Sequence, residues 1–115
     1  SADMRDIDKA IAAGNKRAEL ALEIFINRVV KYVGSFYAEL GGLDVLVFAG
    51  GIGENNRTLR QKIAQKLSCL GIVIADNLNQ ELTEGVISPA DAKVTTLVVP
   101  TNEELAMVQE IKAVM

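Results

Sequence analysis

Histidine is absent from this sequence of 115 residues, and cysteine occurs once, as Cys69. The commonest general base and metal ligand is therefore missing, and a single thiol can form neither an internal disulfide nor a zinc site. Cys69 lies in the apolar segment KLSCLGIVI, where we expect a small buried hydrophobe rather than a reactive thiol. Any chemistry in this chain must rely on carboxylates, backbone amides and cations.

Basic runs and aromatic residues are also scarce. The formal net charge is -3, and the aromatic residues are three Phe and two Tyr. Nucleic-acid binding depends on neutralised phosphates and stacked bases, so we expect no nucleic-acid partner. No apolar run reaches the roughly 18 residues of a membrane helix, and the start SADMRDIDK carries acids where a signal peptide carries bases. These absences predict a soluble, cytoplasmic chain without a membrane partner.

Apolar residues make up 50% of the sequence, enough for the core of one domain. Their spacing predicts a short helix from Asp6 that Gly14 closes, and then a long helix over residues 15–40 that Gly41 ends. The apolar stripe of the long helix, which is wide enough to contact more than one neighbour, comprises Ala18, Leu22, Phe25, Val29, Val33, Phe36 and Leu40, widened by Ile26, Val30 and Tyr37.

Two later segments are predicted strands. The nearly continuous apolar run 43–49 is typical of a strand buried on both faces of a parallel sheet, and residues 93–99 are rich in Val and Thr. Between them, GIVIAD at 71–76 is a short strand candidate, and residues 77–85 are expected to form a surface excursion without regular structure. The segment VIS then returns toward the sheet, before a turn at Pro89.

A second amphipathic helix is predicted to begin near Asn55 and to end at Gly71. Its inner face would carry Leu59, Ile63, Leu67 and Leu70, and its solvent face Arg57, Arg60, Gln61, Lys62, Gln65 and Lys66. With a last helix from Thr101, the order is helix, strand, helix, short strand or hairpin, strand, helix, which predicts an α/β fold with a small, mostly parallel sheet. Because two or three strands are few for such a sheet, we expect a C-terminal piece of a larger protein.

The segment VFAGGIGENNR runs from a buried strand through glycines into a helix. Such a turn points backbone amides and the positive end of the helix at the carboxyl edge of the sheet, where ligands bind. Glycines let a ligand approach the backbone closely. However, the segment lacks the third glycine of a dinucleotide motif and the Lys-Ser/Thr of a P-loop. On this pattern alone, a plain tight turn capped by Asn55 or Asn56 is an equally good interpretation.

Two charged segments add candidate ligand-binding residues. In PTNEEL, Thr101 and Glu104 fit a capping box, which leaves Glu103 either to hold Mg²⁺ or simply to favour the helix dipole. In SADMRD, Asp3 suits a ribose hydroxyl and Arg5 suits an adenine face. Charged residues near a terminus are usually just solvated, so the residue types alone favour the solvated interpretation of SADMRD.

The segments SADMRDI, KRAELALEIFINRVVKYVG, VFAGGIGENN and VVPTNEEL, in this order, resemble the C-terminal part of the acetate kinase family, which includes the propionate kinases. The likeness covers essentially the whole chain, and GGIGEN followed by PTNEE is its most specific part. The resemblance implies an actin-like, ribonuclease H-like fold. Residues 1–115 would form a single partial domain, the C-terminal part of the second domain, and the N-terminal domain would be absent.

The resemblance also implies roles for individual residues. Asp3, Met4 and Arg5 match the segment that contacts the adenosine end of ATP, Gly51, Ile52, Gly53, Glu54 and Asn55 match the nucleotide-binding turn, and Glu103 matches the magnesium-site carboxylate. Ala49 stands where the family commonly has Thr, which removes a hydroxyl near the turn. The family's transition-state arginines, its catalytic histidine, and the carboxylate and asparagine of its first domain have no counterpart here.

The family, by this resemblance, transfers a phosphoryl group between ATP and a short carboxylate with Mg²⁺ as cofactor, and forms homodimers through the second domain. The expected function is therefore the nucleotide-binding portion of an acetate kinase, or of a propionate kinase, without catalytic residues and inactive on its own. The alternative is a non-catalytic adenosine-binding or dimerisation module, whose dimer surface would be the striped helix over residues 15–40.

Overall fold

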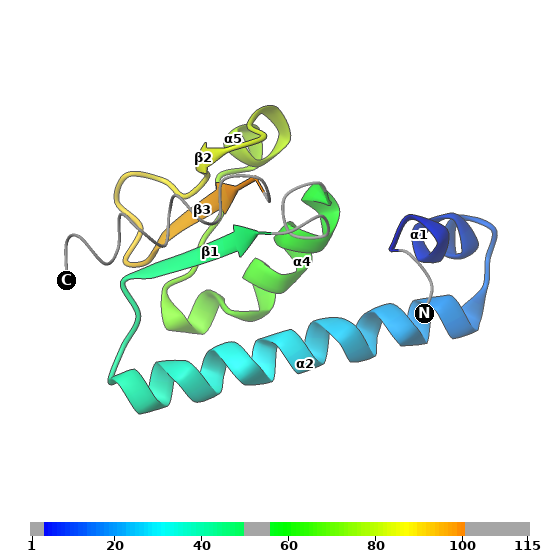
Figure 1. The fold of residues 1–115 in the computed structure, drawn as a ribbon, viewed down its shortest axis with the longest axis horizontal. Coiled ribbons are helices and arrows are strands. Elements are labelled where there is room, and N and C mark those ends of the chain that lie inside the picture. The colour runs from blue at the N-terminus through cyan, green and yellow to red at the C-terminus, as the bar shows by residue number, and fades with distance from the viewer. Residues whose placement is uncertain (1–3, 50–55, 101–115) are drawn as a thin grey trace.

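The computed structural model describes residues 4–49 and 56–100 (Figure 1), and the side chains of residues 4 and 5 are left aside. The elements in chain order are α1 (Met4–Ala12), α2 (Lys16–Leu40), β1 (Val45–Ala49), α4 (Arg57–Lys66), the 3-10 turn η1 (Ser68–Leu70), α5 (Asp76–Glu81), β2 (Gly85–Val86) and β3 (Thr95–Val99). The predicted α/β class is confirmed. The helix predicted from Thr101 lies outside the described residues.

The two predicted N-terminal helices are confirmed. Gly14 follows α1 with φ +86°, a left-handed conformation that glycine adopts without strain. Asn15 caps α2 because its side-chain Oδ1 accepts hydrogen bonds from the backbone N–H groups of Arg17, at 3.0 Å, and Ala18, at 3.1 Å. Gly41 ends α2 in the left-handed conformation. None of the described helices is both long and apolar enough to cross a membrane.

The sheet has three described strands in the order β1-β3-β2. Strands β1 and β3 are parallel, with Val45 opposite Thr95 and Ala49 opposite Val99, whereas β2 is antiparallel to β3. The predicted parallel pair is therefore confirmed, with a short antiparallel strand added at one side. Because β1 and β3 run in the same direction, both end at the same edge of the sheet.

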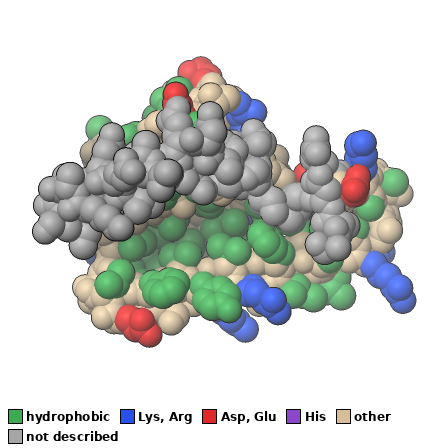
Figure 2. Space-filling model, in the orientation of Figure 1, with side chains coloured by type: hydrophobic (Ala, Val, Ile, Leu, Met, Phe, Trp, Pro, Cys, Tyr) green, Lys and Arg blue, Asp and Glu red, His purple; other side chains and the backbone are tan. Residues whose placement is uncertain are grey.

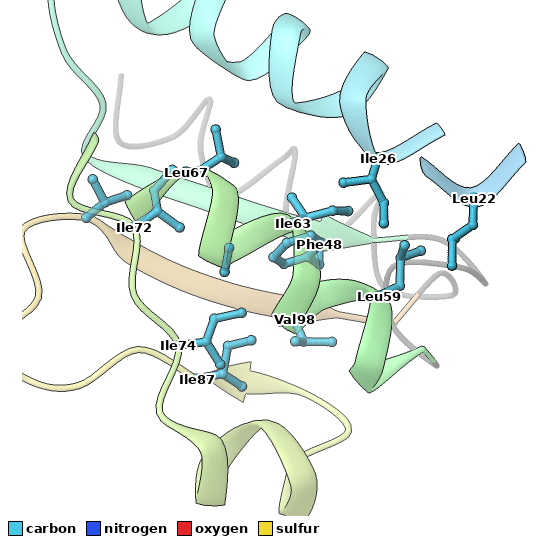
Figure 3. Close-up of a cluster of buried hydrophobic side chains, with 12 residues drawn as sticks. Leu22, Ile26, Phe48, Leu59, Ile63, Leu67, Ile72, Ile74, Ile87 and Val98 are labelled. Atoms are coloured by element: carbon cyan, nitrogen blue, oxygen red, sulfur yellow. The ribbon is translucent and has the colours of Figure 1, made fainter. Parts of the chain in front are cut away.

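The hydrophobic core lies between α4 and the sheet, with α2 packed on α4. Figure 3 shows Leu59 and Ile63 of α4 among buried side chains from α2, from β1 and from the later segments. The core comprises Leu22 and Ile26 from α2, Phe48 from β1, Leu59, Ile63, Ala64 and Leu67 from the α4 region, and Ile72, Ile74, Ile87, Val94 and Val98 from the later segments. One helix therefore organises most of the interior.

Strand β1 is buried on one face, not on both as its sequence predicts. Phe48 points into the core, while Val45 and Val47 are 44% and 42% exposed. Successive side chains of a strand alternate between the two faces, and the helices of the described chain pack on the Phe48 face only. A strand with two apolar faces thus has one of them uncovered in this part of the chain.

The region after Gly71 differs from its prediction. Residues 72–75 belong to no helix or strand, although the N–H of Ala75 donates a hydrogen bond to the carbonyl of Ile87 at 2.8 Å. The expected irregular excursion contains the helix α5. Residue 85 begins the returning strand β2, and the turn after Pro89 is confirmed by a hydrogen bond from the N–H of Ala92 to its carbonyl. Helix α5 lacks an apolar stripe, which is why its sequence did not predict it.

Two side chains have the opposite burial to that expected. Arg60, placed by helical spacing on the solvent face of α4, is 0% exposed. Cys69, expected to be a buried hydrophobe, is exposed. Cys69 lies in η1, where the helix tightens after Leu67, so the periodicity of α4 no longer determines which side chains point inward.

Candidate functional site

The candidate site is the edge of the sheet where β1 and β3 end. Ala49 and Val99, the last residues of the two strands, are register partners. The sequence continues from Ala49 into the glycine segment and from Val99 into PTNEEL. Since ligands of α/β sheets bind beyond the carboxyl ends of strands, both segments start where a ligand would lie.

Most of the predicted site residues lie outside the described part of the chain. These are Asp3, Gly51, Ile52, Gly53, Glu54, Asn55 and Glu103. Met4 and Arg5 are described by their backbone alone, as the first residues of α1. Their assigned roles therefore stay predictions, and the described residues supply the frame around them.

Helix α4 begins directly after the glycine segment. Asn56 is its N-cap, and the side-chain Oδ1 accepts a hydrogen bond from the N–H of Leu59 at 2.9 Å. Of the two asparagines considered for this role, the structure thus assigns Asn56. The positive end of α4 lies at the end of the glycine segment, where it favours an anionic group.

Helix α1 reaches the start of α4 although 48 residues separate the contacting positions. The side-chain Nδ2 of Asn56 donates a hydrogen bond to Oδ2 of Asp8 at 3.1 Å. A cavity of about 330 Å³ lies at this junction, and Asp8, Asn56 and Thr58 are among the residues that line it. This volume is at the lower limit of small-ligand pockets. The segment that carries Met4 and Arg5 is thereby brought next to the end of the glycine segment.

A buried polar cluster near the site was missed in the sequence. Arg60 donates hydrogen bonds from Nε to Oδ1 of Asn79, at 2.9 Å, and from Nη2 to the carbonyl of Asn79, at 3.1 Å. Burial, and secondarily the positive charge of Arg57, lower the pKa of Arg60 below its ordinary value. The sequence contained one signal for this burial. Ala64 follows Arg60 by four positions, which places both residues on the same face of the helix, and Ala64 is buried.

Two further polar atoms of α4 are buried. Within the described residues, Arg57 Nε and Gln61 Oε1 have no hydrogen-bond partner. The described residues also contain no cluster of three or more Cys, Asp or Glu that could hold a metal ion. Glu103, the predicted magnesium-site carboxylate, lies outside these described residues.

Comparison with known proteins gives consistent matches over this frame. The sequence model of the acetokinase family matches residues 1–109. The acetate kinase of Limosilactobacillus fermentum is 50% identical over 113 residues, which are 97% of this chain and 28% of that protein. The crystal structure of Porphyromonas gingivalis acetate kinase matches with a TM-score of 0.82 and 44% identity, covering 94% of this chain and 28% of that one.

A propionate kinase is nearly as similar. The crystal structure of the enzyme from Francisella tularensis matches with a TM-score of 0.78 and 42% identity, again over 94% of this chain and 28% of that one. These matches identify the described helices and strands as part of an actin-like fold. The chain spans about 28% of the length of the curated relatives it matches. With a family match over residues 1–109, the chain belongs to the acetokinase family.

Proposed function

We propose that this chain is the C-terminal, nucleotide-binding portion of a short-chain carboxylate kinase. In the complete enzyme a carboxylate oxygen of acetate would attack the γ-phosphorus of ATP, and the bond to the bridging oxygen would break to release ADP and acetyl phosphate. The observation that supports this proposal best is that the described residues next to the three predicted binding segments lie close together. Ala49 and Val99 are paired, and the glycine segment and PTNEEL continue from them. The contact between Asp8 and Asn56 links α1, which carries Met4 and Arg5, to the start of α4.

Each segment would supply one kind of contact. Asp3, Met4 and Arg5 would hold the adenosine end, and the backbone of Gly51, Ile52, Gly53, Glu54 and Asn55 would lie against the nucleotide. Glu103 fits Mg²⁺ in ligand chemistry, because a carboxylate oxygen is the ligand type that this ion prefers, directly or through its waters. When bound, the ion would neutralise charge on the transferring phosphoryl group.

The chain alone should not catalyse the transfer. Phosphoryl transfer depends on cations placed around the moving group, and the resemblance assigns the family's transition-state arginines to segments that this sequence does not contain. Residues 1–115 would then be one partial domain. Whether the complete enzyme prefers acetate or propionate is set by acyl-pocket residues, which the resemblance also assigns outside this chain.

Nucleotide binding is tested by titrating the isotope-labelled chain with ADP and following backbone amide shifts. We expect shifts concentrated at residues 51–55 and in α1. Absence of any shift at millimolar ADP would contradict the binding role. Inactivity is tested in the same preparation, since acetate-dependent ATP turnover above that of Glu103→Ala would contradict it.

Self-association is a second candidate function, favoured by exposed apolar side chains along α2. Leu20, Ile24, Tyr32, Phe36 and Leu40 are exposed there. Figure 2 shows hydrophobic side chains along α2 and in the hollow above it, and a cavity of about 200 Å³ lies between α2, β1 and α4. Exposed apolar side chains that gather along one element are typical of a contact surface. Sedimentation of the chain over a range of concentrations would detect a dimer, and a monomer at all concentrations would contradict this role.

A further inference from the structure

The buried pair of Arg60 and Asn79 joins α4 to α5, and the proposed nucleotide contacts do not include it. The two residues are 0% and 1% exposed. The guanidinium of Arg60 donates to both the side chain and the backbone carbonyl of Asn79, a planar forked contact that a Lys ammonium cannot reproduce. Arg60 therefore fixes both the position and the orientation of Asn79.

Asn79 in turn holds α4 at a second point. Its side-chain Nδ2 donates a hydrogen bond to the carbonyl of Arg57 at 3.0 Å. Arg57 is the first residue of α4 and Arg60 is three residues later, so one asparagine contacts both ends of the first helical turn. Asn56, the N-cap residue of α4, also holds this turn, because its side chain accepts a hydrogen bond from the N–H of Leu59.

Stability alone does not explain an arginine at this position. Desolvation of a guanidinium is costly, and the neighbouring Arg57 adds charge repulsion. An apolar residue of similar volume would fill the interior without either penalty. Directional hydrogen bonds differ from apolar packing in one respect, which is that they specify a single relative placement of the two helices.

We propose that Arg60 and Asn79 are positioning residues for nucleotide binding. They fix the first turn of α4, and with it the attachment point of residues 51–55, which precede Asn56 in the chain. This inference rests on the proposed nucleotide-binding role. Small displacements of binding groups reduce binding strongly, so a loosened first turn would weaken the nucleotide site without unfolding the domain.

Two measurements on the full chain test the proposal: hydrogen exchange of individual amides, and the dissociation constant for ADP. The variant is Asn79→Ala, and its matched control is Asn77→Ala, an exposed asparagine of the same helix. In Asn79→Ala we expect the amides of Leu59 and Arg60 to exchange at least about tenfold faster relative to that of Leu67. We also expect the dissociation constant to rise about fivefold or more. The control should change neither value.

A second variant, Asn79→Asp, separates the two halves of the cluster. The aspartate keeps an acceptor for Arg60 but has no donor for the carbonyl of Arg57, so the buried guanidinium stays partnered and the fold is retained. We expect the first turn of α4 to loosen as in Asn79→Ala. This variant also provides the test if the alanine variant does not fold.

Three outcomes would overturn the proposal. Equal acceleration of exchange at Leu59 and Leu67 would mean that Asn79 contributes only general stability. Faster exchange in the first turn with an unchanged dissociation constant would remove the link to nucleotide binding. If the unsubstituted chain does not bind ADP at all, the proposed function and the nucleotide part of this inference both fail, whereas the exchange data still decide whether Asn79 fixes α4.

Discussion

Helices α2 and α4 differ in how much of their surface is buried within this chain. In α4, which has 10 residues, Leu59, Arg60, Ile63 and Ala64 are all buried. In α2, which has 25 residues, only Leu22 and Ile26 are buried, and large apolar side chains face outward. Two helices with clear apolar stripes thus have different roles. The stripe of α4 is buried within this chain, while α2 carries exposed apolar side chains at the end of its stripe, at Phe36 and Leu40, and beside it, at Leu20, Ile24 and Tyr32.

The strongest test of this difference substitutes the same residue type in both helices. Ile63 is 3% exposed and Ile24 is 54% exposed. We expect Ile63→Ala to lower the free energy of unfolding by about 2–5 kcal/mol, because it leaves a cavity between α4 and the sheet. Ile24→Ala should change it by less than about 0.5 kcal/mol. Urea unfolding followed by circular dichroism measures both, and equal losses would show that α2 is packed more tightly than its exposure indicates.

Two glycines extend the comparison to the backbone. Gly71 ends η1 with φ +89°, and a Cβ there would lie 2.9 Å from Cβ of Lys93. Gly34 is inside α2, and a Cβ there would meet nothing within 4 Å. We expect Gly71→Ala to destabilise the chain by about 1–3 kcal/mol through strain, and Gly34→Ala to stabilise it by about 0.5–1 kcal/mol. Thermal unfolding measures both changes in stability, and a loss of stability in Gly34→Ala would contradict the open space around Gly34.

A buried hydroxyl in β3 gives an interior position where a substitution should raise the free energy of unfolding, whereas Ile63→Ala should lower it. Thr96 is fully buried, and its Oγ1 has no hydrogen-bond partner within the described residues. Thr96→Val keeps the shape of the side chain and removes the unsatisfied group, so we expect a gain of about 1 kcal/mol in the free energy of unfolding. Thr95→Val, at the half-buried neighbouring position, is the control. A loss of stability in Thr96→Val would mean that the hydroxyl has a partner.

The smallest effect on stability is expected at the exposed apolar positions of α2. Phe36 is exposed there, and Gln is a good helix former, so Phe36→Gln should change the free energy of unfolding by less than about 0.5 kcal/mol. If α2 forms a self-association surface, the same substitution should weaken association several-fold in sedimentation experiments. Glu39→Gln, which leaves the apolar residues in place, is the control. Unchanged association in Phe36→Gln would place the contact elsewhere.

Elements with a strong local signal were predicted well from the sequence. The long helix α2 has an asparagine cap, a glycine stop and a regular stripe, and β3 is a run of Val and Thr ending before Pro100. These signals are local, because capping and periodicity involve residues only a few positions apart. Their success explains why the two N-terminal helices, the helix after the glycine segment and the parallel pair of strands were also predicted correctly.

Features that depend on distant contacts were not predictable. The burial of Arg60 depends on helix α5, because Arg60 donates a hydrogen bond to Asn79 of α5, which lies 19 residues later in the sequence. The exposure of Val45 and Val47 depends on which helices cover β1, which the strand's own composition does not encode. For the candidate site, the sequence correctly predicted a helix start beside the glycine segment, while the contact between Asp8 and Asn56 emerged only in three dimensions.

The position of β1 has a consequence for handling the protein. Within the described residues β1 pairs with β3 alone, so one side of VLVFA presents backbone N–H and C=O groups without a neighbouring strand. The segment is apolar, uncharged and free of proline, the composition of strands that template further strand addition. Backbone hydrogen bonds and apolar contacts respond little to ionic screening. We therefore expect dilution to reduce aggregation of the isolated chain, and added salt to have little effect on it.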